Sequence, residues 1–128
     1  MTAPKQLNLE KTIKTITMKE SRLDLVTSMH TKNPKDSYLA FAAAIENQTA
    51  GNPKKAMQII EKLIEYDPDY AEAYYKLGKM YEEANKTKKA ITTYLTGKEV
   101  ATKNNDEKTL GEISEALMFL DDEEESSW

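Results

Sequence analysis

The chain has 128 residues, with 22 acidic side chains against 18 basic ones and no cysteine. This length suits one domain that can bury a core of its own, and the lack of cysteine excludes disulfides and thiolate metal sites. No apolar run approaches the ~20 residues that a membrane span needs, and the first residues lack the apolar stretch of a signal peptide. We therefore expect a soluble, cytoplasmic protein without a membrane partner.

The net charge of −4 is concentrated at the C-terminus. Asp121 to Glu125 are five consecutive acidic residues that contribute −5, which leaves the rest of the chain near +1. Because no basic stripe stands out, a nucleic-acid partner has little electrostatic support. Charge repulsion predicts a disordered acidic tail over residues 122–128. Trp128, the only tryptophan, leaves open that this end docks into a groove.

The chain begins with a leader of residues 1–17, which we expect to be flexible. A single domain is predicted over residues 18–121. Its first helix covers about residues 19–31 and ends at Asn33-Pro34, because proline disfavours helical backbone in the residue before it. His30, the only histidine, lies near the helix end, where the helix dipole favours a positive charge. This position predicts a structural role for His30.

The second predicted helix covers about residues 36–49 and contains the segment SYLAFAAAI, which is apolar almost all round. This pattern leaves open whether Phe41 and Ile45 are buried between neighbouring helices or form an exposed binding patch. Gly51 suits the left-handed residue that follows a helix. Asn52-Pro53 then reads as an N-cap followed by proline at the first helical position, which begins a third helix over about residues 53–66.

The fourth predicted helix covers about residues 70–83, and Asp69 with Glu72 resembles a capping box at its start. Asn85 tolerates the left-handed conformation that would end it. One face of this helix follows the spacing i, i+3, i+4, i+7 that is typical of an amphipathic helix. Its residues are Tyr74, Leu77, Gly78 and Tyr81.

The fifth predicted helix covers about residues 87–103 and has one stripe of small and apolar residues. They are Ala90, Tyr94, Gly97 and Ala101. Because Gly78 costs roughly 0.5–1 kcal/mol inside a helix, we expect Gly78 and Ala90 to mark the place where two helix backbones approach closely.

The sixth predicted helix covers about residues 106–121 and follows a turn at Asn104-Asn105. Asp106 and Glu107 favour a helix start there through the macrodipole. Leucine and isoleucine recur along it at helical spacing, so we interpret it as a capping helix at the C-terminal end of the domain. These residues are Leu110, Ile113, Leu117 and Leu120.

The pattern of the central helices repeats with a period of 34 residues. Pro34 and Pro68 are one period apart, and so are Ala56 and Ala90. A fixed period in this range indicates stacked supersecondary units. We predict an all-α fold of about six helices, with antiparallel helix-turn-helix repeats over residues 37–70 and 71–104 and a flanking helix at each end.

The second repeat resembles the tetratricopeptide repeat in the following residues: Pro68, Tyr74, Leu77-Gly78, Tyr81, Ala90 and Tyr94. The first repeat departs from this motif at four places: Ala40, Ala43, Ala44 and Asn47. The third unit has only its first helix, with a spacing two residues longer. The resemblance implies a short right-handed α-solenoid that binds protein segments and has no catalytic activity.

In this family the first helix of each repeat lines the concave face. Carried onto this chain, the resemblance implies eight peptide-binding residues: Tyr38, Phe41, Ile45, Gln48, Glu72, Tyr75, Lys79 and Glu82. The apolar members would anchor a peptide, and the charged members would fix its register. A groove of this kind accepts an extended peptide or an amphipathic helix.

No catalytic centre, metal site or cofactor is predicted. The chain has one histidine and no cysteine, and it has neither a glycine-rich phosphate loop nor a convincing set of nucleophile, base and orienting group. We therefore expect a non-catalytic adaptor whose partner is a protein or peptide. Two alternatives stay open. One is a self-assembling module, such as a homodimer that pairs through Met118 and Phe119, and the other is an accessory subunit of an enzyme or nucleic-acid complex.

Overall fold

The computed structural model describes the backbone of residues 22–126 and the side chains of residues 22–120. A first helix over residues 22–32 precedes five others. They are α2 (Ser37–Thr49), α3 (Pro53–Tyr66), α4 (Ala71–Glu83), α5 (Thr87–Lys103) and α6 (Glu107–Ser126). These described residues contain no strand. The predictions for the leader, the start of the first helix and Trp128 fall outside them.

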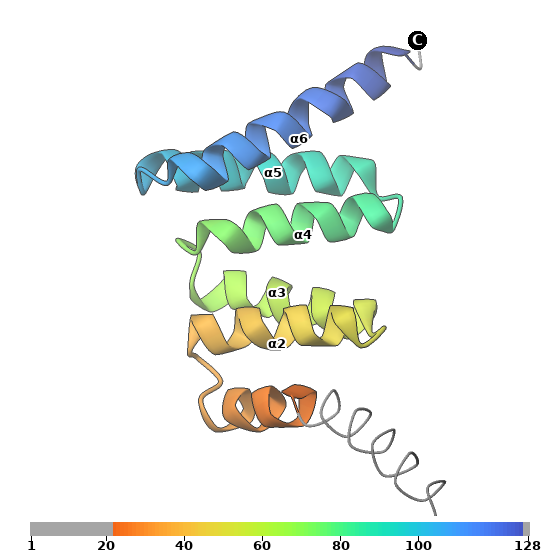
Figure 1. Cartoon of the computed structure of the whole chain (residues 1–128). Helices are drawn as coiled ribbons and strands as arrows, with labels where there is room; N and C mark the ends of the chain where they lie inside the picture. The colour runs from red at the N-terminus through yellow and green to blue at the C-terminus, as the bar shows by residue number, and fades with distance from the viewer. Residues whose placement is uncertain (1–21, 127–128) are drawn as a thin grey trace, which may run out of the picture.

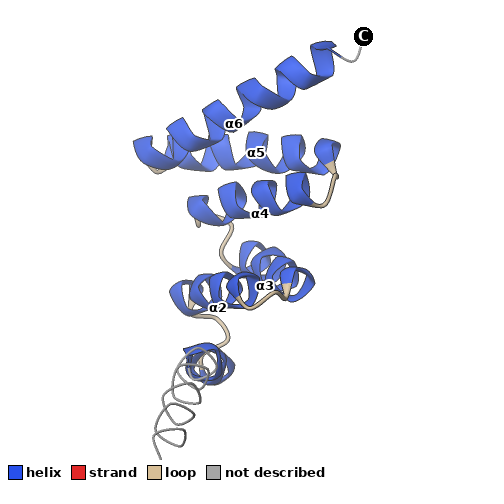
Figure 2. Ribbon diagram, turned by 45° about the vertical axis from the view of Figure 1, so that its right-hand side comes forward, coloured by secondary structure: helices blue, strands red, loops and turns tan. Residues whose placement is uncertain are grey.

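Consecutive helices run antiparallel and stack in one direction (Figures 1 and 2). The most extensive pairs are α4 with α5, α2 with α3, and α5 with α6, whereas α3 and α4 meet over a smaller area. The first helix therefore lies at one end of the stack and α6 at the other (Figure 1). This arrangement confirms the predicted solenoid of two helix pairs with a flanking helix at each end.

Helix α6 ends at Ser126, beyond the boundary near residue 121 that the charge pattern predicted. Residues 121–126 contain no glycine or proline, which are the residues that most often end a helix. Like-charge pairs four residues apart cost only a few tenths of a kcal/mol each. The helix therefore includes most of the segment that was predicted as a disordered tail.

Three of the turns between helices have the same backbone design. Gly51, Asn85 and Asn105 adopt positive φ angles of 86°, 60° and 56°. In each case the next amide reaches back to a carbonyl in the last helical turn, as Asn52 N–H does to Asn47 O at 2.8 Å. This bond satisfies a carbonyl that the helix end leaves free. The predicted left-handed positions Gly51 and Asn85 are thus confirmed.

The predicted start of α4 is wrong in its capping residue. Tyr70 is the N-cap and makes no side-chain capping bond, so Asp69 and Glu72 form no capping box. Asp69 instead tethers the next repeat: Lys103 Nζ lies 3.3 Å from its carboxylate, and Asn104 Nδ2 donates to its carbonyl at 2.8 Å. The carboxylate and the backbone carbonyl of Asp69 thus contact residues that lie 34 and 35 positions away, which spacing within one helix does not reveal.

The start of α3 follows the prediction in position but not in chemistry. Asn52 is the N-cap, and Pro53 occupies the first helical position, as predicted. The Asn52 side chain makes no capping bond. Its Nδ2 donates instead to Oδ1 of the buried Asn47 at 3.4 Å. Asn47 in turn donates to Ala43 O at 2.8 Å, so its amide is satisfied within the core.

Two tyrosine side chains of the second repeat pack against two glycines. A Cβ added at Gly78 of α4 would lie 2.6 Å from Cζ of Tyr94, which belongs to α5. A Cβ added at Gly97 of α5 would collide with Cβ of Tyr74 in α4 and would lie 2.9 Å from Cδ1 of Ile113, which belongs to α6. Gly78 therefore makes room for a side chain, and not for the close backbone contact that we predicted.

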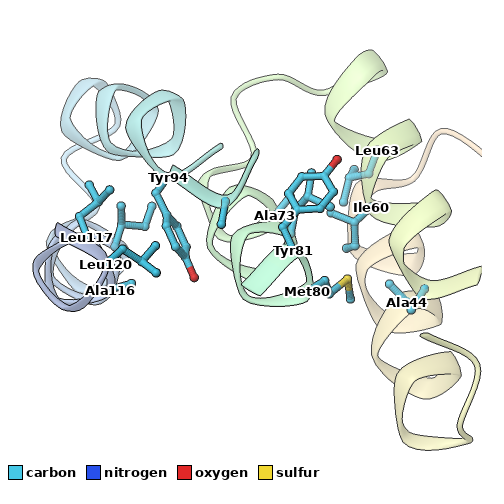
Figure 3. Packing of buried hydrophobic residues seen from close by; sticks show 14 of the residues in the cluster. Ala44, Ile60, Leu63, Ala73, Met80, Tyr81, Tyr94, Ala116, Leu117 and Leu120 are labelled. Carbon is cyan, nitrogen blue, oxygen red and sulfur yellow. The ribbon is translucent and has the colours of Figure 1, made fainter. Parts of the chain in front are cut away.

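The ring of Tyr94 is fully buried and extends from α5 toward α4 and the apolar side chains of α6 (Figure 3). Ile60 and Leu63 of α3 pack beside Tyr81 and Ala73 of α4 in the same view. One continuous cluster of buried side chains thus joins α2 through α6.

Gly78→Ala should destabilise the protein by about 1–3 kcal/mol, because overpacking at the Tyr94 ring outweighs the gain in helix propensity. The control is Gly111→Ala in α6, where an added Cβ meets no atom within 4 Å. That change should stabilise the protein by about 0.5–1 kcal/mol. Urea unfolding measures both, and equal stabilisation by the two alanines would contradict the packing.

Candidate functional site

The predicted site residues lie at matching positions of α2 and α4. Helix α2 begins at Ser37 and α4 at Ala71, and each has 13 residues, so the 34-residue offset relates them. Both sets follow the spacing i, i+3, i+7, i+10, which places each set on one side of its helix. We call this surface the α2/α4 face and define it by the eight predicted residues.

The α2 part of the α2/α4 face is aromatic. Tyr38 is 73% exposed, whereas Phe41 is half-buried because its ring packs on Tyr70 at a centroid distance of 5.5 Å. Ile45 and Gln48 are also half-buried. Phe41 and Ile45 are therefore neither fully buried nor fully exposed, and Tyr38 is the most accessible aromatic residue of this part.

The α4 part of the face is an interlocked cluster. Lys79 Nζ lies 5.7 Å from the centre of the Tyr75 ring and 3.8 Å from the carboxylate of Glu82. The Tyr75 ring lies 6.3 Å from that of Tyr94, and the Tyr94 hydroxyl donates a hydrogen bond to Glu82. Glu82 is therefore held by the protein itself, whereas the exposed Glu72 has no ion pair among the described residues.

Tyr70 supports the α2/α4 face through its contact with Phe41 and was missed by sequence reasoning. It precedes α4, outside the helical stripe, and only the packing of α2 against the start of α4 brings it to Phe41. Burial raises the pKa of Tyr70, and the nearby carboxylate of Glu72 raises it further. No spacing rule connects Tyr70 with Phe41, because they are 29 positions apart and only Phe41 lies in a helix.

The α2/α4 face continues onto α6 at an offset of 36 residues. Helix α6 begins 36 positions after α4, and buried Leu77 and Tyr81 correspond to buried Ile113 and Leu117. The matching position to Glu82 is Met118, which is 68% exposed. The prediction placed Met118 at a pairing surface and did not include it in the groove, because groove residues were assigned to the two complete repeats only.

Two further grooves lie away from the α2/α4 face. One of about 260 Å³ separates His30 of the first helix from α3 and is lined by Ile59, Lys62 and Tyr66 among others. The other, of about 350 Å³, lies between the start of α3 and the end of α4 and includes Met57 and Met80. Both are open surface grooves, and neither contains a predicted site residue.

The described part of the chain has no group of three histidine or acidic side chains placed to hold a metal ion. Within residues 22–126, no helix is both long and apolar enough to cross a membrane. The chemistry that the α2/α4 face offers is therefore aromatic contact, one partly exposed ammonium group and carboxylates.

Helical hairpins stacked around small residues at a 34-residue offset define a helical-repeat solenoid. Residues 48–107 match the family model of the tetratricopeptide repeat. A tetratricopeptide repeat domain protein of Salinibacter ruber, known from a crystal structure, is 38% identical with a TM-score of 0.65, and the match covers 67% of this chain and 97% of that chain. The chain belongs to the tetratricopeptide repeat family, as the sequence motif implied.

Two more distant structures share the fold. PcrH, solved in complex with the chaperone binding region of PopD, has a TM-score of 0.76 at 9% identity, over 92% of this chain and 90% of that chain. The TPR2B domain of yeast Sti1, in its Hsp70 complex, has a TM-score of 0.64 at 17% identity, over 83% and 90%. No curated protein sequence matches the chain significantly.

Tyr94→Phe should cost about 1–2 kcal/mol at neutral pH, because the carboxylate of Glu82 loses a buried donor. Burial and the bond to Glu82 raise the pKa of Tyr94, so the folded state keeps this proton after an unfolded tyrosine ionises near pH 10. Stability from Tyr94 is thus complete below about pH 10 and is lost as the pH rises above it.

The cost of Tyr94→Phe should therefore shrink by about 1 kcal/mol between about pH 8 and pH 11. Urea unfolding of the wild type and the variant at both pH values measures this difference. A cost that stays constant over this range would contradict the assignment of the raised pKa to Tyr94.

Proposed function

We propose that the protein is a non-catalytic scaffold that binds a peptide segment of a partner protein on the α2/α4 face. Protein–protein interaction is the general function that membership of the tetratricopeptide repeat family supports. PcrH and the Sti1 domain, whose structures contain a chaperone-binding region of PopD and an Hsp70 component respectively, are examples with the same fold. The particular face and residues are our proposal.

The observation that carries the proposal is the exposure of Tyr38 on the same helix as Phe41, whose ring packs on Tyr70. Tyr38 is 73% exposed, while Phe41 is held by Tyr70. A tyrosine adds contact area at low entropic cost because it has few rotatable bonds. A partner's apolar side chain that packs against Tyr38 would therefore find a rigid aromatic surface behind it.

The second anchor is the ammonium group of Lys79. Its side chain is 44% exposed, and its contacts with Tyr75 and Glu82 limit the conformations it samples. A partner carboxylate that approaches Lys79 would meet a donor that is already oriented, so less side-chain entropy is lost on binding. Because the group is partly exposed, this contact contributes more to register than to affinity.

The ligand that fits is an extended or helical segment with an apolar residue near Tyr38 and an acidic residue near Lys79. These two anchors lie on successive first helices of the stack (Figure 1). The exposed Glu72, at the start of α4, disfavours an acidic residue of the segment near it. The proposal therefore specifies a pattern of apolar and acidic residues, in that order from α2 to α4.

The test uses peptides selected on the wild-type protein from a random library, with affinities measured by calorimetry. Tyr38→Ala and Lys79→Ala should each weaken the selected peptides, by about tenfold for Tyr38, which corresponds to about 1.4 kcal/mol. The control is Lys62→Ala, which removes an exposed lysine from α3, outside the face. Peptides that bind all of these variants equally well would exclude the α2/α4 face.

A further inference from the structure

The groove between the first helix and α3 has an apolar floor. We call it the α3 groove and define it by the residues that line it: His30, Lys55, Gln58, Ile59, Lys62 and Tyr66. Ile59 and Tyr66 are half-buried, and both pack against the buried core. The hydroxyl of Tyr66 is buried, so a ligand would meet the tyrosine ring and not its polar end. The floor therefore offers a supported apolar surface to a side chain of a ligand.

The rim of the α3 groove carries cations and donors, and the residues that line it include no carboxylate. Lys55, Gln58 and Lys62 share one side of α3, because they are three and four residues apart, and His30 lies across the groove on the first helix. Both lysines are exposed, and neither has an ion pair among the described residues. The positive charge of the rim is therefore available to a ligand.

Charge is divided between two sets of helices. The first helix, α3 and α5 together carry nine basic residues and four acidic ones, whereas α2, α4 and residues 107–120 of α6 carry three basic and seven acidic ones. An acidic ligand is therefore attracted to the first set and repelled by the second. The basic residues form no stripe along the sequence, because they are distributed over helices that lie apart in the chain.

We propose that the α3 groove is a second binding site, whose ligand is an acidic peptide segment of a partner protein with an apolar residue between two carboxylates. The apolar residue packs on Ile59 and Tyr66, and the carboxylates pair with Lys55 and Lys62. These lysines are seven residues apart, which is two helical turns or about 10 Å. An extended segment covers that distance in about three residues, so the two acidic residues of the ligand are three positions apart.

The end of the groove beside Tyr66 limits the length of the acidic segment. Burial raises the pKa of Tyr66, and the carboxylates of Asp67 and Asp36 raise it further, so both carboxylates lie near this tyrosine. An acidic run that continued beyond Lys62 would meet their negative charge. The groove therefore fits a short acidic motif better than a nucleic acid, whose phosphates continue in both directions.

The experiment is an NMR titration of the full chain with a short peptide that has two aspartates three positions apart, a leucine between them and serine elsewhere. His30 is the only histidine, so its ring signals report on the groove directly. These signals and the amides of α3 should shift in a saturable way, with a dissociation constant on the order of 1 mM or below. The affinity should fall as salt is added.

Variants of the peptide test its two kinds of anchor while the protein stays unchanged. Serine in place of the leucine removes the apolar contact, and asparagine in place of both aspartates removes the charge at nearly the same shape. Each change should weaken binding about tenfold. Equal affinity of the serine peptide would overturn the apolar seat, and equal affinity of the asparagine peptide would overturn the role of the lysines.

Reversal of charge in the protein locates the site. Lys55→Glu combined with Lys62→Glu should weaken binding at least about tenfold, because both carboxylates of the peptide are then repelled. The matched control combines Lys88→Glu with Lys98→Glu, which changes the net charge equally at exposed positions of α5 and should weaken binding less than about twofold. Lys79→Ala belongs to the α2/α4 face and should leave this binding unchanged, so the two sites are tested separately.

Four results would overturn the proposal. The first is no shift of the His30 signals at peptide concentrations up to about 5 mM, and the second is an equal loss of affinity in both double variants. The third is a short oligothymidylate that shifts the same signals at lower concentration than the peptide, which would indicate a nucleic-acid site. The fourth is binding that is seen only after deletion of residues 1–17, which would assign the groove to the leader of the same chain.

Sedimentation equilibrium without peptide tests one more occupant, which is a second copy of the chain. The protein should keep the mass of one chain, 14.6 kDa, at the concentrations of the titration. A dimer that the combined change of Lys55 and Lys62 abolishes would assign the groove to a second copy and would overturn the proposal.

Discussion

The structure depends on two contacts between α4 and α5, in each of which a tyrosine of one helix packs against a glycine of the other. Tyr94 fills the space over Gly78, and Tyr74 fills the space over Gly97. Neither contact leaves room for a Cβ at the glycine, and the packing offsets the helix propensity that each glycine lacks. This pair of contacts sets how closely the two helices approach, and α6 then packs on the surface that Tyr94 helps to build.

The first repeat reaches a similar arrangement by different means. Alanines of α2 replace the aromatic and glycine positions of α4, and the polar Asn47 occupies the place of Tyr81. Small side chains allow α2 and α3 to pack without interlocking rings. The amide of Asn47 donates to Ala43 within α2 and accepts from Asn52 at the start of α3. Helices α2 and α4 are equal in length despite this different packing, and their 34-residue offset relates the two halves of the α2/α4 face.

The same residues serve both the core and the candidate site. Glu82 accepts a hydrogen bond from the hydroxyl of the buried Tyr94 and also pairs with Lys79. The α4 part of the α2/α4 face is therefore an extension of the α4–α5 packing. Phe41 is similarly supported by Tyr70. A partner would therefore meet side chains that are already positioned, which lowers the entropic cost of binding. Substitutions that weaken the core beneath them should also loosen the site.

The sequence by itself determined the helices, the 34-residue repeat and the end positions Gly51 and Asn85, because these depend on local backbone preferences and periodic burial. Only the tertiary structure decided that Gly78 accommodates the ring of Tyr94, that Asp69 accepts a hydrogen bond from Asn104 and that Tyr70 packs on Phe41. These contacts join different helices or turns, and their geometry depends on how each helix is rotated and spaced against its neighbour, which the periodicity along one chain does not encode.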